Sequence, residues 1–329
     1  MLRDSFGRVA TDLRVSLTDK CNLRCTYCMP PEGLDWLPNA QLLTADEVVR
    51  LVSLGVERLG ITEVRYTGGE PLLRRELADI VARTAALEPR PQISLTTNGI
   101  GLARLAGPLA DAGLDRVNVS LDTLDPATFK RLAHRDRHAD VIAGLAAADR
   151  AGLRPVKVNA VLMRGVNEHE AVPLLRWCLE QGYELRFIEQ MPLDAQHRWT
   201  RESMVTADEI LGLLSEAFDL TPDDLEERGS APAERFLVDG GPARVGVIGS
   251  VTRPFCGACD RVRLTADGQV RNCLFATEES DLKAAMRAGA TDDELAERWR
   301  AAVGRKRAGH GIDDPSFLQP ARPMSAIGG

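Results

Sequence analysis

The sequence predicts an α/β fold, a (β/α)6 partial TIM barrel whose open side is closed by a C-terminal extension. Two observations support this prediction. Runs rich in β-branched residues alternate with segments of helical periodicity from residue 12 to about residue 190, and the alternation is lost beyond that point. Polar motifs also follow successive strands, where α/β folds place their functional sites. We therefore expect a barrel domain at residues 1–190 and an extension at residues 191–329; a doubly wound open sheet is the alternative.

Six strands and five helices are expected in the barrel. The strands are placed at residues 12–18, 63–67, 92–97, 116–121, 155–162 and 184–189, and the helices at 45–59, 76–87, 103–112, 141–151 and 171–181. Thr44, followed by Glu47 three residues later, forms a capping box that sets the start of the first helix. Gly113, Gly152 and Gly182 stand just beyond three helix ends, where a left-handed residue is favoured. Strands and helices in this order predict a parallel sheet.

The extension contains shorter elements. Thr206 and Glu209 form a second capping box, which begins a helix that runs through Ala217. The charged, proline-rich residues 222–232 indicate a loop. Beyond it we expect short strands at 236–238 and 243–248, a hairpin that turns at Asp267 and Gly268, and helices at 281–288 and 294–303.

Composition bounds the class of protein. The chain has 329 residues, of which 44% are hydrophobic, so it can bury a large core. Its net charge of −7 offers no basic stripe, and no polymeric nucleic acid is expected as a partner. The first 14 residues carry charges and no apolar segment, which argues against a signal peptide. No uncharged apolar run approaches the roughly 18 residues of a membrane helix. A soluble, cytoplasmic protein without a membrane partner is expected.

Three cysteines follow the first expected strand in the motif C-N-L-R-C-T-Y-C-M-P, at Cys21, Cys25 and Cys28. A 4Fe-4S cluster normally takes four thiolates, so three cysteines leave one iron open to bind and activate a small molecule. A zinc site and a disulfide are the alternatives. Zinc sites usually pair cysteines as C-x2-C and need a fourth ligand, and no His or Cys follows nearby. The spacing therefore favours an open cluster; Cys178, by contrast, is expected to pack in a helix core.

A second triplet, Cys256, Cys259 and Cys273, lies in the extension around the expected hairpin. The same argument predicts a second open cluster, while a zinc site with His310 as the fourth ligand stays open. Arg261 and Arg263 alternate along one strand and suit recognition of a phosphate beside the cluster. Their alternative is an ordinary solvated strand face.

Polar motifs at five further strands indicate one pocket. They are T-G-G-E-P at 67–71, T-T-N-G at 96–99, N-V-S-L-D at 118–122, K-V-N at 157–159 and R-F-I-E-Q-M-P at 186–192. T-T-N-G on its own is more typical of a glycine turn. The chain also carries a terminal Gly328-Gly329, which is usually a frayed end. Two residues without side chains, however, also suit a tail that threads into a crowded pocket.

Together these residues resemble the radical S-adenosylmethionine (SAM) superfamily, whose cluster motif is similar to C-N-L-R-C-T-Y-C-M-P. The chain resembles in particular the MoaA family of GTP 3′,8-cyclases, over nearly its full length. The resemblance rests further on L-R-V-S-L-T-D-K, V-R-Y-T-G-G-E-P-L-L-R, the second triplet with D-R-V-R-L, and the Gly-Gly tail. Residues 222–235 are left outside this comparison, and nothing catalytic is assigned to them.

The resemblance implies a role for each matching residue. Two 4Fe-4S clusters would be held by Cys21, Cys25 and Cys28 and by Cys256, Cys259 and Cys273. The SAM site would be formed by Tyr27, Gly68, Gly69, Glu70, Ser120 and Met191, with Gly68 to Glu70 at the methionine amino group. GTP would be contacted by Arg14, Arg65, Thr96, Lys157, Arg261, Val262 and Arg263. Gly328 and Gly329 would reach the active site and be required for activity.

The resemblance also implies the reaction. Cleavage of SAM would give a 5′-deoxyadenosyl radical that takes the 3′ hydrogen of GTP, and the ribose C3′ would then attack C8. The product, (8S)-3′,8-cyclo-7,8-dihydroguanosine 5′-triphosphate, is the first intermediate of molybdenum cofactor biosynthesis. A flavodoxin or ferredoxin would donate electrons, the product would pass to cyclic pyranopterin monophosphate synthase, and a homodimer is one candidate assembly.

Two other functions share part of the pattern. A radical SAM enzyme that acts on a peptide would share the first triplet but would not require Arg261, Arg263 or the Gly-Gly tail. A non-enzymatic protein with two three-cysteine zinc sites would contain zinc and no iron.

Overall fold

A computed structural model describes residues 1–223 and 228–328. Its main feature is one twelve-stranded sheet, with strand order β14-β13-β12-β3-β4-β5-β6-β7-β8-β11-β10-β9. The six strands expected in the barrel form its centre, as β3 (Asp12–Ser16), β4 (Glu63–Thr67), β5 (Gln92–Thr97), β6 (Arg116–Ser120), β7 (Lys157–Val161) and β8 (Glu184–Ile188). All of them pair in parallel with their sequence neighbours. The predicted (β/α)6 partial barrel is confirmed.

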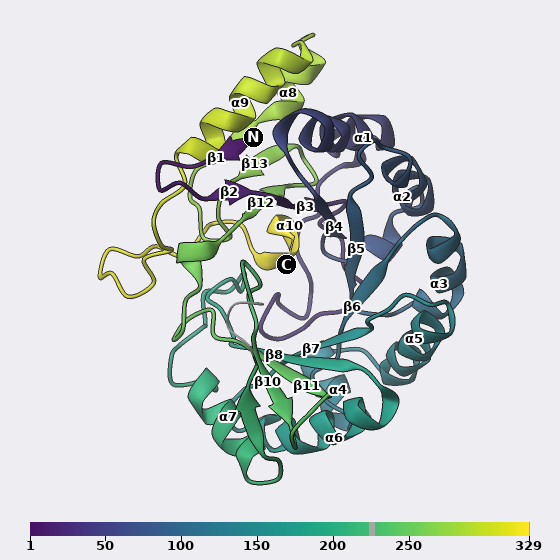
Figure 1. The fold of residues 1–329 in the computed structure, drawn as a ribbon, viewed down its shortest axis with the longest axis vertical. Helices are drawn as coiled ribbons and strands as arrows, with labels where there is room; N and C mark the ends of the chain where they lie inside the picture. Colours follow the sequence, from purple (N-terminus) through teal and green to yellow (C-terminus); the bar gives the residue numbers. More distant parts are fainter. Residues whose placement is uncertain (224–227, 329) are drawn as a thin grey trace.

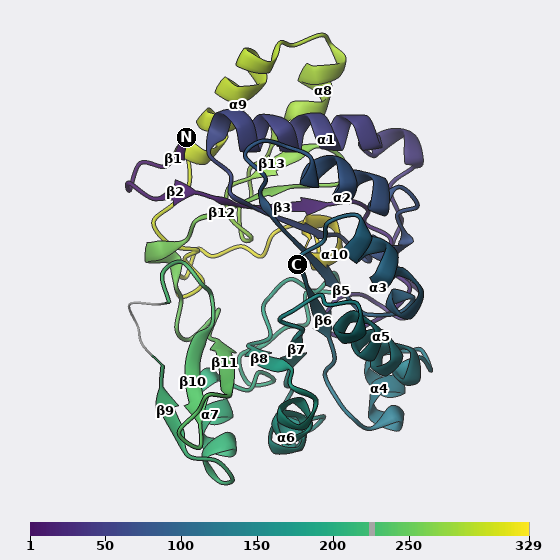
Figure 2. The same cartoon turned by 45° about the vertical axis from the view of Figure 1, so that its right-hand side comes forward.

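The extension adds strands to both edges of this central sheet. On one edge, β12 (Arg261–Leu264) pairs in parallel with β3, and β13 (Gln269–Arg271) and β14 (Ser280–Asp281) follow it in antiparallel order. On the other edge, β11 (Arg244–Ile248) pairs in parallel with β8, and β10 (Glu234–Val238) and β9 (Leu220–Pro222) continue the sheet. Strand β12 of the extension thus stands beside β3, the first strand of the barrel (Figure 2). The division at residue 190 stays a prediction.

Helices cover the outer face of the curved sheet (Figure 1). They are α1 (Ala45–Ser53), α2 (Leu77–Ala85), α3 (Leu102–Asp111), α4 (Pro126–Ala133), α5 (His138–Arg150) and α6 (Ala171–Gln181). The capping box of Thr44 and Glu47 is formed as expected, and a π-helical turn at Leu54–Arg58 completes the first predicted helix. Gly113, Gly152 and Gly182 adopt positive φ values, as their positions predicted. The sequence did not predict α4, which begins at Pro126 after the N-cap Asp125.

Three helices of the extension lie at the sheet edges. α7 (Ala207–Ser215) begins with the predicted capping box of Thr206 and Glu209. α8 (Leu282–Arg287) and α9 (Asp292–Gly304) lie side by side near α1 (Figures 1 and 2). Part of the predicted 222–232 loop, residues 224–227, lies outside the described residues. A two-stranded pair, β1 (Leu2–Arg3) with β2 (Val9–Ala10), was not expected from the sequence.

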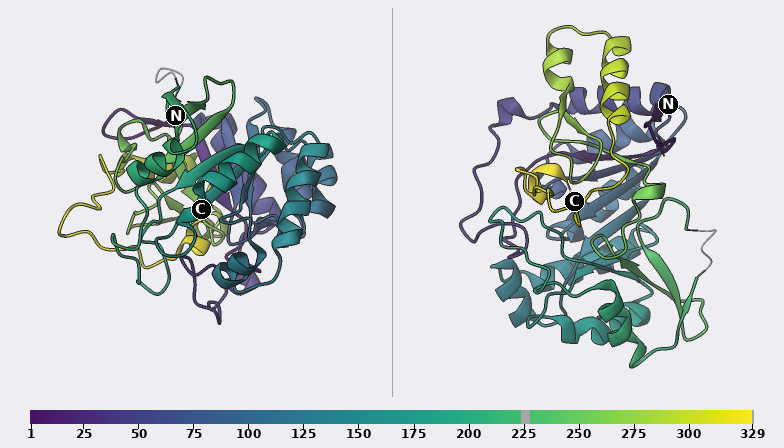
Figure 3. Two further views of the ribbon diagram at one scale, coloured as in Figure 1. Left: turned by 90° about the horizontal axis from the view of Figure 1, so that it is seen from below. Right: turned by 90° about the vertical axis from the view of Figure 1, so that its left-hand side faces the viewer.

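The concave face of the sheet holds the site. The strands bury alternate residues against the outer helices, for example Val64, Tyr66 and Phe187, which are all fully buried. Their other residues face the inside of the barrel, where the short helix α10 (Met324–Ile327) lies (Figure 1). Two further views show the tail enclosed by the sheet and the loops around it (Figure 3). The fold therefore brings the last part of the chain into the centre of the barrel.

Candidate active site

The first cysteine triplet lies on the loop that follows β3. Cys21, Cys25 and Cys28 are free thiols and partly buried. All three line one cavity, together with residues from the ends of β4, β5 and β6 and from the tail. Because the carboxyl ends of parallel strands meet at one edge of the sheet, the loop faces the polar motifs that follow the neighbouring strands.

The donor set around these thiols fits an iron–sulfur cluster. Hydrogen bonds from the Leu23 backbone N–H (3.5 Å) and the Asn98 side-chain amide (3.7 Å) reach the sulfur of Cys21. Such N–H···S bonds stabilise the charge on cluster ligands. Burial raises the pKa of Cys25 well above its usual value and the pKa of Cys28 to about 12. Deprotonation of these thiols therefore depends on a bound metal group, as is usual for thiolate ligands.

Two glycines allow the T-G-G-E-P loop to approach the cysteine loop. A β-carbon at Gly68 would lie 2.4 Å from the carbonyl oxygen of Thr18, and one at Gly69 would lie 2.3 Å from that of Asp19. These contacts are with backbone atoms that cannot move aside. Both glycines line the cavity of the first triplet, so a ligand there can approach their main chain directly.

Glu70 ties this loop to the end of β5. Its buried carboxylate accepts hydrogen bonds from the Thr97 hydroxyl (2.7 Å), the Asn98 N–H (2.7 Å) and the Leu72 N–H (2.9 Å). Burial raises the pKa of Glu70 to about 7, although these bonds act in the opposite direction. Glu70 thus has a structural role in addition to the expected contact with SAM, which stays a prediction.

Tyr27 forms a pair with Asp122 in the wall of the same cavity. The Tyr27 hydroxyl donates a 2.7 Å hydrogen bond to Asp122, whose other oxygen accepts from the Val161 N–H at 2.9 Å. Burial raises the pKa of Asp122 to about 6. Ser120, two residues before Asp122 at the end of β6, and Met191 line this cavity as well. The structure therefore gathers the predicted SAM residues other than Glu70 around one cavity.

The second triplet lines a cavity in the extension. Cys256, Cys259 and Cys273 lie there with Arg261, Arg263 and His310. Lys306 donates to the sulfur of Cys259 at 3.2 Å and to two backbone carbonyls. Burial would raise the pKa of Cys259, but the charges of Arg261 and Lys306 lower it to about 7. These two cations thus favour the thiolate form of Cys259, which a metal cluster requires.

His310 lies beside this triplet, as a zinc site with His310 as the fourth ligand would require. Its backbone N–H bonds to Cys256, and its side chain lines the same cavity. Among the described residues, however, no group of three or more His, Cys, Asp and Glu side chains is arranged to hold a metal ion. This applies equally to both cysteine triplets, so it does not distinguish a zinc site from an iron–sulfur cluster.

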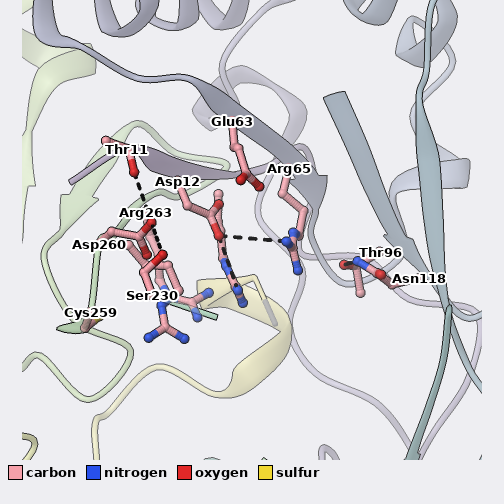
Figure 4. Close-up of polar contacts among 12 residues, drawn as sticks. Thr11, Asp12, Glu63, Arg65, Thr96, Asn118, Ser230, Cys259, Asp260 and Arg263 are labelled. Carbon is pink, nitrogen blue, oxygen red and sulfur yellow. Dashed lines mark hydrogen bonds and ion pairs between the residues drawn. The ribbon is translucent and has the colours of Figure 1, made fainter. Parts of the chain in front are cut away.

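A row of arginines crosses adjacent strands on the inside of the barrel, and Figure 4 labels Arg65 and Arg263 of this row. Arg263 of β12, Arg14 of β3 and Arg65 of β4 occupy matching positions on adjacent parallel strands. Asp12 lies near Arg14 (3.6 Å) and Arg65 (3.8 Å). Burial would raise the pKa of Asp12, but the charges of these arginines lower it.

The positive charge of this row exceeds what Asp12 can balance. Burial and the charge of Arg65 lower the pKa of Arg14 to about 10, and burial also lowers the pKa of Arg263. Several of their nitrogen atoms have no hydrogen-bond partner among the described residues, including Nε of Arg14 and Nε and Nη2 of Arg261. Buried cations without counter-ions are unfavourable, so the row is arranged to receive an anion. Arg261 also stacks over the Phe255 ring, 4.5 Å from its centroid.

The remaining predicted substrate residues lie on neighbouring strands. Lys157 begins β7 and forms a 2.7 Å ion pair with Glu184. Thr96 lies in β5 and accepts from the Asn118 amide at 3.4 Å. Val262 is fully buried between Arg261 and Arg263, so only its backbone could contact a ligand. Arg14, Arg65 and Arg263 lie within their strands and Arg261 begins β12, so these arginines lie deeper in the barrel than the first triplet, which follows the carboxyl end of β3.

The tail joins the two regions. Gly328 has φ +86°, and a β-carbon there would lie 2.8 Å from Thr67 Cγ2 and 3.2 Å from Ser16 Cβ. Its carbonyl accepts a hydrogen bond from Arg263. The expectation of a tail threaded into a crowded site is thus met at Gly328, while Gly329 lies outside the described residues.

Several residues of the site were not singled out from the sequence. Asn98 and Lys306 donate to cysteine sulfurs. Arg186 is partly buried and donates to Asn118 (2.9 Å) and Asn159 (2.8 Å), and desolvation lowers its pKa to about 9. Asn98, Asp122 and Arg186 all stand in motifs that the sequence did mark as polar, which was the available signal. Lys306 follows a helix in the extension and carries no local signal.

A parallel partial barrel with a three-cysteine loop after its first strand defines a radical SAM protein. Residues 15–178 match the model of the Radical SAM superfamily, and residues 183–312 match that of Molybdenum Cofactor Synthesis C. The chain is 70% identical over its full length to a GTP 3',8-cyclase of Streptomyces coelicolor, covering 96% of that protein. It is 62% identical to GTP 3',8-cyclase 2 of Mycobacterium tuberculosis (strain H37Rv), covering 92% of it. The chain belongs to the GTP 3',8-cyclase (MoaA) family, as expected.

Solved structures share the fold at low sequence identity. Streptococcus suis SuiB bound to S-adenosylmethionine superposes with a TM-score of 0.62 at 14% identity, over 89% of this chain and 66% of that chain. SuiB bound to the precursor peptide SuiA gives a TM-score of 0.56 at 13% identity, over 94% of this chain and 67% of that chain. At this identity the likeness concerns the fold alone. Membership of the radical SAM superfamily implies one 4Fe-4S cluster and SAM.

Within residues 1–223 and 228–328, none of the helices has the length and apolar character needed to span a membrane.

Proposed function

We propose that this chain is a GTP 3′,8-cyclase that converts GTP to (8S)-3′,8-cyclo-7,8-dihydroguanosine 5′-triphosphate, the first step of molybdenum cofactor biosynthesis. Family membership supports the activity. The structural observation that carries it is that Met191 lines both the cavity of the first triplet and that of the second. We call the cavity of the first triplet the first chamber and that of the second triplet the second chamber. Because they adjoin inside one barrel, they can hold SAM and GTP close enough to react.

The first chamber is assigned to SAM. The cluster held by Cys21, Cys25 and Cys28 supplies, when bound, the electron that cleaves SAM to methionine and a 5′-deoxyadenosyl radical. Gly68 and Gly69 line this chamber, and their main chain would offer polar groups to the methionine end of SAM. Tyr27, Ser120 and Met191 form the walls. Glu70 orients the loop by its bonds to the end of β5.

The second chamber is assigned to GTP. GTP carries roughly four negative charges at neutral pH, and the arginine row supplies the missing counter-charge. Arg14, Arg65, Arg261 and Arg263 all act on the carboxylate of Asp12, and Glu63 also acts on Arg65. Thr96, Lys157 and the backbone of Val262 complete the predicted contacts. The whole chain has a net charge of −7, so this excess of cations is local to the barrel.

A second 4Fe-4S cluster is assigned to Cys256, Cys259 and Cys273. Three free thiols line one cavity, and two cations lower the pKa of one of them to about 7. With three protein sulfurs, this cluster would keep one iron for the guanine of GTP. Residues of the extension line both chambers, and those of the tail line the first; we expect them to shield a radical from water and stray hydrogen donors.

The cellular setting is proposed from the same assignment. We place the protein in the cytoplasm, with a flavodoxin or ferredoxin as electron donor and cyclic pyranopterin monophosphate synthase as the enzyme that receives the product. The extension at residues 191–329 is proposed as a unit that completes the barrel domain at residues 1–190, and a homodimer is the candidate assembly.

The decisive experiment is an anaerobic single-turnover assay with GTP, SAM and a strong reductant, read by mass spectrometry. We expect cyclised GTP, 5′-deoxyadenosine and methionine in equal amounts, and about eight irons per chain if both clusters form. SAM cleavage without any cyclised nucleotide would contradict the proposal. Two zinc ions and no iron per chain would show that the protein is not a radical SAM enzyme.

A further inference from the structure

The tail brings a buried serine to the first chamber. Ser325 lies in α10 and is 3% exposed. It lines the cavity of the first cysteine triplet beside Cys28 and Met191, and its backbone N–H donates to the sulfur of Cys28. Its hydroxyl oxygen has no hydrogen-bond partner in the part of the chain that the structure describes. A buried hydroxyl without a partner in a ligand cavity indicates that a ligand supplies the partner.

The position of this serine is set by its neighbours and not by its own hydroxyl. The N–H of Met324 donates to the carbonyl of Leu193 at 3.0 Å, and the N–H of Gly328 donates to the carbonyl of Met324 at 3.0 Å. Ile327 is fully buried in an apolar cluster with Leu193 and Phe275. Because packing holds α10 on both sides of Ser325, its hydroxyl is presented to the cavity before any ligand binds.

We propose that Ser325 is a further SAM-binding residue, whose hydroxyl forms a hydrogen bond with a polar group of SAM. This inference rests on the proposed function, because it takes the first chamber as the SAM site. A hydroxyl can both donate and accept, and SAM offers carboxylate, amino, ribose and adenine groups. The tail would then contact both reactants, with Ser325 in the SAM chamber and Gly328 at the arginine row. SAM binding and docking of the tail would stabilise each other.

The test measures SAM and GTP affinities separately, by anaerobic equilibrium dialysis of the cluster-loaded protein without reductant. Ser325→Ala should weaken SAM binding about 3- to 10-fold, the effect of one lost hydrogen bond, and leave GTP affinity and iron content unchanged. Ser316→Ala is the matched control, since Ser316 is an exposed serine of the same tail. Hydrogen–deuterium exchange of residues 318–328 reports whether the tail stays docked.

A pair of variants with side chains of the same shape separates loss of the hydroxyl from a change in packing. Ser325→Thr keeps the hydroxyl and Ser325→Val replaces it by a methyl group of similar shape, so their difference in SAM affinity isolates the hydroxyl. We expect the Val variant to bind SAM several-fold more weakly than the Thr variant. Equal affinities in this pair, or an unchanged affinity in Ser325→Ala, would overturn the inference and leave the proposed function intact. A wild-type protein that does not bind SAM at all would instead refute the proposed function.

Discussion

The guanidinium of Arg263 donates a hydrogen bond to the backbone carbonyl of Gly328, which lies 65 residues later in the chain. Arg263 is in register with Arg14 on the adjacent strand, so this bond places the tail beside the arginine row. On the other side, Thr67 and Ser16 leave no room for a side chain at Gly328. The tail is therefore packed into the barrel as part of its wall.

This packing predicts that Gly328→Ala displaces the tail. The methyl group would lie 2.8 Å from Thr67 Cγ2, at a backbone φ of +86° that L side chains rarely adopt, and a strained conformation of this kind costs about 1–3 kcal/mol. We expect cyclisation to slow by about 100-fold, because small displacements of reacting groups have effects of that size. Iron content and SAM binding should change far less. Product formation and iron are measured on the same anaerobic sample.

The matched control for this variant is Gly304→Ala at the end of α9, where a β-carbon meets nothing within 4 Å. That variant should be fully active. Deletion of Gly328 together with Gly329 should spare folding and both clusters and stop turnover. Full activity of the truncated protein would show that these two glycines are a frayed end with no role in turnover.

The separation of the two cysteine triplets predicts different defects on mutation. Each triplet lines its own cavity. Cys21→Ser should abolish SAM cleavage, because the first cluster activates SAM. Cys273→Ser should leave some uncoupled cleavage, seen as 5′-deoxyadenosine, without cyclised GTP. Cys178→Ala, at a fully buried cysteine outside both cavities, should retain both products; identical defects in the first two variants would contradict the division of roles.

Local sequence patterns were sufficient for the barrel itself. The six central strands and five of the helices on their outer face could be predicted because β-branched runs, capping boxes and glycines at helix ends act over a few residues. The Thr44 capping box and the positive φ of Gly182 are examples. The cysteine loop and the glycine loop could be predicted for a similar reason, since each is a continuous motif.

Long-range pairings could not be predicted in this way. β12 joins β3 and β11 joins β8 across the sequence, and such partners are chosen by packing of the whole barrel. The same limit applies to Asp12, whose position among four arginines follows from the register of β3 with β4 and β12. Lys306 reaches Cys259 only because α9 ends beside the second cavity.

Burial of Glu70 predicts a pH-dependent contribution to stability. Burial raises the pKa of Glu70 to about 7 in the folded chain from a usual value of 4.5. The folded state therefore binds the proton more tightly, so the contribution of this group is fully present below about pH 4.5 and is lost as the pH rises to about 7. The loss is at most about 3 kcal/mol, from the size of the shift. Urea unfolding between about pH 5 and pH 8 would measure it.

Glu70→Gln isolates this contribution, because Gln cannot titrate. The difference in unfolding free energy between wild type and variant should fall from about pH 5 to about pH 7 and stay constant above that. Changes in hydrogen bonding caused by the amide shift the whole difference by a constant and do not affect its slope. A difference that is independent of pH over this range would show that Glu70 is not perturbed.

Arg261 and Lys157 should contribute unequally to GTP binding. Two nitrogens of Arg261 have no hydrogen-bond partner among the described residues, and Phe255 holds its guanidinium in place. Lys157 already forms a 2.7 Å ion pair with the partly exposed Glu184, so a contact with GTP must replace that pair. Loss of a charge-assisted contact costs roughly 1–3 kcal/mol. We expect Arg261→Ala near the upper end of this range and Lys157→Ala near the lower end.

Equilibrium dialysis with GTP under anaerobic conditions gives both dissociation constants. Arg300→Ala is the control, because Arg300 lies on α9, outside both cavities, and forms an exposed ion pair with Glu297. It should bind GTP like wild type, whereas loss of Arg261 should weaken binding by up to about 150-fold. Because the other arginines of the row remain, some affinity should persist in each single variant. Unchanged binding in Arg261→Ala would remove this residue from the GTP site, and a larger effect from Lys157→Ala would show that its pair with Glu184 does not compete with the nucleotide.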